Sequence, residues 1–234
     1  MKKLAFLILF LCLSGWVYLQ STNSKQSEIT TNISAETVVD TTSFFLKKGD
    51  ILVRPNWSWL PGSCPVANGR KYGHVAIVTQ GASGKTIDEA LEKATVIEAL
   101  FFDQATRSFQ FEKKDQIREA KASISFGRKF KGIRYRLHTS LSPEQTDKMI
   151  SFLRNQLDGG YDILSLKHEI EGSNRKEVAL SAIKNRDWHC ATLVWEAFYL
   201  SAGIDLDANQ GRLIYPSDII ACKQFDLPGG RIRF

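Results

Sequence analysis

The sequence of 234 residues has few of the residues that build metal centres and disulfide frameworks, with four cysteines and four histidines. It has no internal repeat, and the polar stretch after the N-terminal segment is the one long region of biased composition. His189 and Cys190 are adjacent, which is not a spacing typical of zinc ligands. These absences argue against a repeat protein and predict no metal site.

The sequence also lacks a large excess of charge of one sign. Its net charge is +6, and its 43% hydrophobic and 24% charged residues are an ordinary balance for a globular domain. Basic residues gather in residues 112–136, which form either a solvated face or a surface attracted to anionic headgroups or wall polymers. Nucleic acid is not expected as a partner, because no binding motif is present. These basic residues are Lys113, Lys114, Arg118, Lys121, Arg128, Lys129, Lys131, Arg134 and Arg136.

Residues 1–22 are predicted to be a signal peptide or a membrane anchor. Two lysines precede an apolar run at residues 4–13, as in a secretory signal, and the stretch is long enough to span a bilayer if it stays uncleaved. Residues 23–43 are mostly polar and predict a flexible tether. We therefore expect export to the periplasm or cell envelope, and a folded domain over residues 44–234.

Export predicts an oxidising compartment, where unpaired thiols need an explanation. With Cys12 in the predicted signal, Cys64, Cys190 and Cys222 remain in the mature chain. A disulfide between Cys64 and Cys222 would leave Cys190 free, but the sequence alone leaves this pairing open.

Apolar runs predict strands at residues 51–54, 74–80, 94–102 and 133–139. Ser142 and Gln145 have capping-box spacing at the start of a helix that ends before Gly159. A second helix begins at Cys190 and ends at Gly203. Because strands and helices are mixed without regular alternation, the fold class is predicted to be α+β.

Cys190 is the candidate nucleophile because it opens its helix. Backbone N–H groups and the positive end of the helix favour a thiolate there, which would lower the pKa of the thiol. The same N–H groups can bind the oxyanion that forms during acyl transfer. The alternative is an ordinary buried cysteine in a helix.

His74 and Glu98 are the candidate partners of this thiol. His74 opens the apolar strand at 74–80, and Glu98 lies inside the apolar run at 94–102. A buried polar group needs a partner, so Glu98 would orient His74 if the two strands are adjacent. The alternative is a purely structural hydrogen bond.

The other three histidines are expected to lie outside the catalytic couple. His189 is next to Cys190, and neighbours on a helix point about 100° apart. His138 and His168 lie among charged residues and are expected at the surface.

Several motifs in order resemble the circularly permuted papain-like amidases, the YiiX-type branch of the NlpC-like cell-wall hydrolase superfamily, to which lecithin:retinol acyltransferase is related. The resemblance covers residues 47–222. The motifs are GDILVRP, YGHVAIVT, VIEAL, IRYRL, GGYD, WHCATLVWEAFYLSAGIDL and IYPSDIIA. Family members often have Ser-Glu after the cysteine, where this chain has Ala191 and Thr192, and this departure bears on substrate preference.

The resemblance implies a permuted papain-like fold, in which a central antiparallel sheet packs against helices and the nucleophile lies at a helix N-terminus. It implies His74 as general base, Glu98 as its orienting partner and Cys190 as nucleophile. Tyr161 would lie near the site and position the substrate or its oxyanion, and Asp50 would be a structural turn residue.

The sequence thus predicts an exported cysteine amidase or acyl hydrolase that needs no cofactor. Its substrate would be a cell-wall peptide, an N-acyl amino acid or a lipid-linked amide. Acyl transfer at the same site and a non-catalytic lipid- or wall-binding module remain as alternatives. Trp57, Trp59 and the residues up to Tyr72 are predicted to form an apolar rim that binds substrate beside His74.

Overall fold

The computed structural model describes residues 36–37, 44–55, 72–103, 108–110, 112, 116–130, 132–163, 166–167 and 186–234. The predicted signal or anchor and nearly all of the predicted tether lie outside these residues. Within the described ranges, no helix is both long and apolar enough to cross a bilayer.

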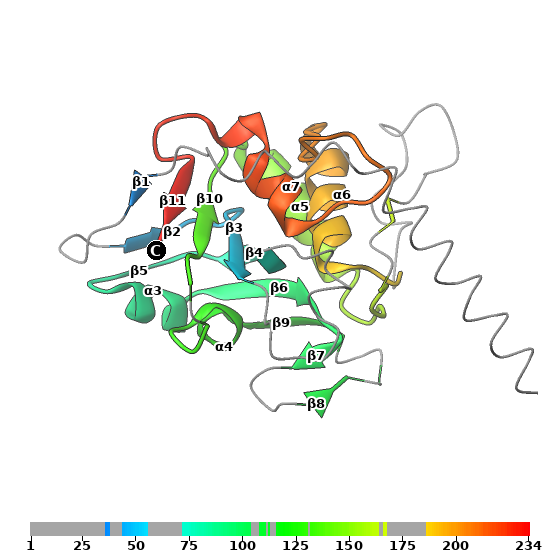
Figure 1. Cartoon of the computed structure of the whole chain (residues 1–234), viewed down its shortest axis with the longest axis horizontal. Coiled ribbons are helices and arrows are strands. Elements are labelled where there is room, and N and C mark those ends of the chain that lie inside the picture. The colour runs from blue at the N-terminus through cyan, green and yellow to red at the C-terminus, as the bar shows by residue number, and fades with distance from the viewer. Residues whose placement is uncertain are drawn as a thin grey trace, which may run out of the picture.

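Seven strands of the described residues form one central sheet in the order β1-β11-β10-β3-β4-β6-β9 (Figure 1). All neighbouring strands are antiparallel except the short edge pair of β1 and β11. The mixed architecture around an antiparallel sheet confirms the α+β class. The strands are β1 (Glu36–Thr37), β3 (Ile51–Pro55), β4 (Tyr72–Gln80), β6 (Thr95–Ala99), β9 (Ile117–Lys121), β10 (Tyr135–Leu137) and β11 (Arg231–Arg233).

Four shorter strands form two separate antiparallel pairs in the described part of the chain. Strand β2 (Phe44–Leu46) pairs with β5 (Ala82–Gly84), and β7 (Phe102–Asp103) pairs with β8 (Ser108–Phe109). The apolar run predicted as one strand at 94–102 is therefore divided, with β6 ending at Ala99 and β7 beginning at Phe102.

Helices cover both faces of the central sheet (Figure 1). On one face lie α5 (Pro143–Arg154), α6 (Cys190–Ala202) and α7 (Pro216–Ala221), which a 3₁₀ turn, η4 (Lys223–Phe225), follows. The other face carries α3 (Ile87–Lys93) and α4 (Ala122–Phe126) together with β2 and β5.

Burial on both faces explains why β3 and β4 are apolar almost throughout. Successive side chains of a strand point to opposite faces, and here each face has its own core. Ile51 and Val53 of β3 pack with the helices α5 to α7, whereas Leu52 packs with α3 and α4. Every apolar residue of these strands therefore has a core to enter.

The predicted helix boundaries are confirmed where capping residues define them. Ser142 Oγ accepts a hydrogen bond from the Gln145 backbone at 3.1 Å, and Gln145 Oε1 accepts one from the Ser142 backbone at 2.9 Å. Helix α6 begins at Cys190 and ends at Gly203, whose φ of 69° lies in the left-handed region that glycine favours. Ten of the thirteen residues of α6 are buried.

A buried glutamine fixes the chain just before α6. Gln156 is fully buried, and its Oε1 accepts from Trp188 Nε1 at 3.0 Å and from the Arg186 backbone at 3.3 Å. Residues 160–162 run beside Trp188, which donates its backbone N–H to the Gly160 carbonyl at 2.8 Å. The segment that delivers Cys190 is thus anchored to the end of α5.

We expect Gln156→Leu to lower the free energy of unfolding by about 1–3 kcal/mol, because it leaves the buried Trp188 N–H and the partly buried Arg186 N–H without their acceptor. Urea denaturation measures the change. Ser142→Ala, which removes a cap at the far end of α5, is the comparison and should cost about 1 kcal/mol. A Gln156→Leu protein as stable as the parent would show that this anchor is dispensable.

Candidate active site

The strand registers place four polar side chains in a row across one face of the sheet. Arg54 of β3 lies opposite His74 of β4, and Glu98 of β6 lies opposite Arg118 of β9. The pairing of Ile77 with Ile97 sets Glu98 diagonally across from His74 on the same face. The sheet therefore brings together residues that are far apart in sequence.

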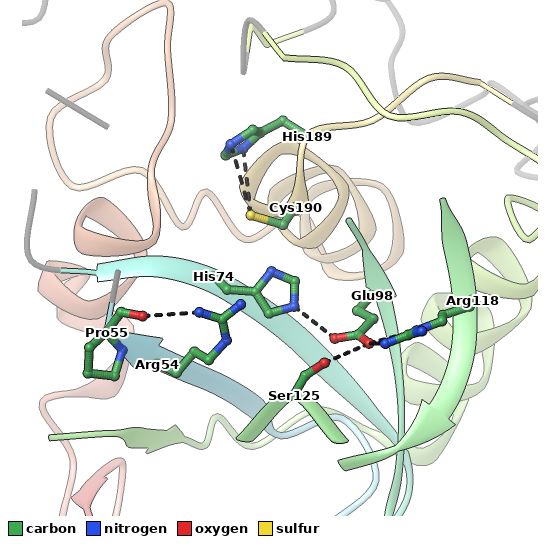
Figure 2. A network of polar contacts seen from close by, with 8 residues as sticks. All are labelled: Arg54, Pro55, His74, Glu98, Arg118, Ser125, His189 and Cys190. Atoms are coloured by element: carbon green, nitrogen blue, oxygen red, sulfur yellow. Dashed lines mark hydrogen bonds and ion pairs between the residues drawn. The ribbon is translucent and has the colours of Figure 1, made fainter. Parts of the chain in front are cut away.

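The carboxylate of Glu98 is the centre of this row (Figure 2). It is 1% exposed, and its Oε2 lies 2.8 Å from His74 Nε2. Its Oε1 accepts from Arg118 Nε at 3.0 Å and from Ser125 Oγ at 2.8 Å. Burial alone would raise the pKa of Glu98, but these partners outweigh burial and lower the pKa to about 2. Glu98 is therefore ionised at neutral pH.

The hydrogen bond to Glu98 defines which nitrogen of His74 carries the proton. An ionised carboxylate only accepts hydrogen bonds, so Nε2 donates and Nδ1 keeps its lone pair. Burial and the charge of Arg54 lower the pKa of His74 below its ordinary value, against the raising effect of Glu98. The ring is 5% exposed and stacks on Phe126 with centroids 5.6 Å apart. His74 is thus a neutral imidazole with Nδ1 available as a base.

Cys190 lies above this imidazole at the start of α6 (Figure 2). Its thiol has a hydrogen bond with the backbone of Val75, the residue after His74. Among the described residues, the pairing of β4 with β6 ends at Ile77 and Ile97, so Val75 is not paired with β6. Figure 2 shows the ring of His74 between the thiol of Cys190 and the carboxylate of Glu98. The structure therefore joins His74 and Glu98 directly and places Cys190 near this pair, but no hydrogen bond links the thiol to His74.

The predicted lowering of the Cys190 pKa is wrong for the folded protein. The side chain is 1% exposed, and burial raises the pKa of the thiol to about 11. Hydrogen bonds with the backbones of Val75 and Ala191 and the charge of Arg54 lower the pKa, but by less than burial raises it. The resting site therefore holds a neutral thiol beside a neutral imidazole.

His189 is closer to the thiol than the helix geometry predicted. Its Nδ1 lies 3.8 Å and its Nε2 4.0 Å from Cys190 Sγ. The reason is that His189 is the N-cap of α6, with an extended backbone (φ −75°, ψ 151°), and folds its ring over the first turn. Nδ1 accepts the Ala191 backbone N–H at 3.2 Å, and burial and the charge of His74 lower the pKa of His189 to about 3. Its Nδ1 lone pair is occupied by the cap.

Tyr161 lies near the site, on the segment beside Trp188. Its ring is 5.6 Å from that of His189, and its backbone N–H donates to Gln116 Oε1 at 2.7 Å. Burial, with the nearby Cys190, raises the pKa of Tyr161 well above its ordinary value, so the phenol stays protonated.

Of the three aromatic residues named for the predicted rim, the structure describes Tyr72. Tyr72 is 4% exposed and packs edge-on against Tyr135 with centroids 5.5 Å apart, so it belongs to the core and not to an exposed rim. The reason is the pairing of β4 with β3, which draws Tyr72 into the sheet opposite Pro55. Trp57 and Trp59 lie outside the described residues.

Arg54 and Ser125 belong to the site although the sequence did not predict them, and His138 is not the simple surface residue that was expected. Arg54 is a lone polar residue in an apolar strand, the same signal that identified Glu98. Ser125 gave no signal, because its contact depends on how α4 packs on the sheet. His138 is no simple surface residue, because its Nδ1 lies 2.6 Å from Oδ1 of the fully buried Asp50. Asp50 Oδ2 also accepts from the Lys47 backbone at 2.8 Å and closes the turn.

Several residues of the basic region have structural partners. Arg118 binds Glu98, Arg128 forms an ion pair with Asp88, and Arg136 is buried and donates to two backbone carbonyls. Arg118 and Arg136 are therefore used within the protein, whereas Arg128 is 75% exposed and an anionic surface as its partner stays a prediction. Lys121 and Lys129 are exposed, and an anionic surface as their partner stays a prediction. Lys113, Lys114 and Lys131 lie outside the described residues.

Cys222 has a free thiol that is 5% exposed and donates to the Asp205 carbonyl at 3.5 Å. Cys64 and His168 lie outside the described residues, but the free thiol of Cys222 means that the predicted Cys64–Cys222 disulfide is not formed in this structure. Where the structure describes the chain, no group of three or more His, Cys, Asp or Glu side chains is arranged to hold a metal ion.

No protein-family model matches the chain, but one curated protein and one solved structure are similar to it. A segment of 31 residues is 55% identical to the uncharacterized protein YycO of Bacillus subtilis, which is 13% of this chain and 13% of that protein. The crystal structure of the metalloprotein yiiX from Escherichia coli O157:H7 aligns with a TM-score of 0.46 and 15% identity, over 76% of this chain and 93% of that one. Neither match assigns a family or a function.

We expect iodoacetamide to label Cys190 slowly at pH 7 and faster as the pH rises toward about 11, because only the thiolate reacts and burial keeps the thiol protonated. Peptide mass mapping gives the rate at each pH, and circular dichroism verifies that the fold persists. Cys190→Ser identifies the labelled peptide. A rate that is already constant above pH 8 would mean that the resting site holds a thiolate.

Proposed function

We propose that this protein is an exported cysteine amidase or acyl hydrolase with a permuted papain-like fold. The observation that supports it best is the position of His74, which is held by a buried carboxylate and turns its other ring nitrogen toward the thiol of Cys190 (Figure 2). A base, its orienting partner and a nucleophile in this order are the parts that thiol acyl transfer needs.

The proposed reaction begins with proton transfer from Cys190 Sγ to His74 Nδ1. The sulfur attacks the substrate carbonyl. The oxyanion is stabilised by first-turn N–H groups of α6 other than that of Ala191, which already donates to the His189 cap. The imidazolium then protonates the leaving amine, and the C–N bond breaks to give a thioester. Water attacks the thioester with His74 as base, which releases the acid and restores the thiol.

Glu98 favours the proton transfer with which this reaction begins. Its ionised carboxylate faces Nε2, so it stabilises the imidazolium that forms when Nδ1 takes the thiol proton. The charge of Arg54 nearby favours the thiolate over the thiol. The reaction therefore creates charges where the site already holds their counter-charges, and it requires no cofactor.

The substrate classes are an amide or ester in a cell-wall peptide, an N-acyl amino acid or a lipid-linked molecule. Acyl transfer uses the same site with an amine or alcohol in place of water, and competing acceptors with product analysis separate the two. The buried, neutral thiol is the one observation that favours a non-catalytic lipid- or wall-binding module, and turnover by Cys190 decides between these alternatives.

The test is hydrolysis of p-nitrophenyl acyl esters and N-acyl amino acid amides by purified variants. Cys190→Ala should abolish turnover, and His74→Ala should lower kcat/KM by about 10²–10⁴-fold because the general base is lost. Glu98→Gln should lower it by less than His74→Ala, since the amide keeps the shape but not the charge. Intact-protein mass spectrometry should show an acyl adduct on Cys190 when ester is in excess.

His138→Ala is the matched control, because His138 is also hydrogen-bonded to a buried carboxylate, that of Asp50, and has no contact with Glu98 or Cys190 in the part of the chain that the structure describes. It should retain nearly full activity if it stays folded, as should Cys222→Ala. His189→Ala should lose activity only in so far as α6 loses its cap. An active His74→Ala beside a folded, inactive His189→Ala would transfer the role of base to His189 and refute this mechanism.

A further inference from the structure

Arg54 is a buried cation that the proposed mechanism uses only through its charge. It is 6% exposed, its guanidinium lies over the ring of Phe130 at 4.4 Å, and Nη1 donates to the Pro55 carbonyl at 3.1 Å. Nε is buried without a hydrogen-bond partner. The guanidinium thus keeps an unused donor within the protein.

No carboxylate of the described residues forms an ion pair with Arg54. The charge of Glu98 raises the pKa of Arg54, but its carboxylate is already bonded to His74, Arg118 and Ser125. A buried charge without a partner is costly, and burial lowers the pKa of Arg54 to about 10. The side chain still carries its charge at neutral pH, so the folded protein maintains a buried cation that the charge of Glu98 stabilises but that has no ion-pair partner among the described residues.

This cation lies beside the proposed nucleophile and base. Arg54 is the register partner of His74, and its charge acts on Cys190. In Figure 2 the end of the guanidinium away from Pro55 turns toward His74 and Cys190. Nε and the neighbouring terminal nitrogen form a planar fork, whose geometry matches the two oxygens of a carboxylate.

We propose that Arg54 binds a carboxylate that the substrate carries on its leaving amine, one carbon from the scissile nitrogen. The substrate would then be an N-acyl amino acid or a peptide cleaved beside its C-terminal carboxylate, and a neutral amide of the same shape would be a poor substrate. That this ligand is a substrate rests on the proposed function, but the binding of an anion by Arg54 does not depend on turnover.

Two alkylating reagents of nearly equal shape test the site without any turnover. Iodoacetate and iodoacetamide both transfer a CH₂ group to the thiolate with loss of iodide, but only iodoacetate carries a carboxylate. We expect the iodoacetate to iodoacetamide rate ratio at Cys190 to exceed the ratio at Cys222 by about tenfold, the scale of one charge-assisted hydrogen bond. Any change in the reactivity of the thiolate itself affects both reagents and leaves the ratio unchanged.

Arg54→Gln should reduce the ratio at Cys190 to that at Cys222, and Arg54→Lys should fall between, because it keeps the charge but loses the fork. Arg128→Gln removes the same charge at an exposed ion pair and should change nothing. Equal ratios in the parent and in Arg54→Gln would overturn the proposal.

A second measurement detects anion binding without labelling, and it serves if the buried thiol reacts too slowly. N-acetylglycine should raise the Tm of the Cys190→Ala protein, while N-acetylglycinamide should not, and Arg54→Gln on that background should remove the difference. No shift with N-acetylglycine and no ratio effect would reject the site. An active amidase without either effect refutes the role of Arg54 alone, whereas both effects without turnover refute the hydrolase and leave the anion site.

Discussion

The buried carboxylate of Glu98 is the constraint on which the arrangement of the site depends. A charge that is 1% exposed must be compensated by its surroundings, and the donors come from β4, β9 and α4. Meeting this demand fixes the spacing of two strand pairs and the position of a helix on the sheet. It also fixes the tautomer of His74, because an ionised carboxylate accepts the Nε2 proton. The site and the sheet are therefore stabilised by the same contacts.

The charges around the thiol would stabilise the products of proton transfer from Cys190 to His74. In the resting site Cys190 and His74 are neutral, while Glu98 is negative and Arg54 and Arg118 are positive. Transfer of the proton would place the new negative charge near Arg54 and the new positive charge against Glu98. Burial opposes ionisation of either group alone, but it strengthens the attraction between the charges once both exist.

Local chemistry made part of this structure predictable from the sequence. The capping box at Ser142, the stop at Gly203 and the lone polar residues in apolar strands identified α5, the end of α6, His74 and Glu98. The rest depended on contacts between distant segments. The register of β4 with β6, the pairing of His138 with Asp50 and the contact of Ser125 with Glu98 leave no mark on any local pattern. The raised pKa of Cys190 has the same origin, because the helix end was visible in the sequence but the burial over it was not.

Helix α6 is covered on nearly every side, and this burial restricts the motion of the thiol at its first residue. Ten of its thirteen residues are buried, so no face of the helix is free to slide without opening the core. The amide protons of its central turns would exchange with solvent only when the whole domain unfolds. Heating should therefore leave the geometry around the sulfur intact up to the melting transition and abolish it there in a single step. Adaptation to ligands of different shape must come from the segments around the helix, since the sulfur itself is as rigid as the core that holds it.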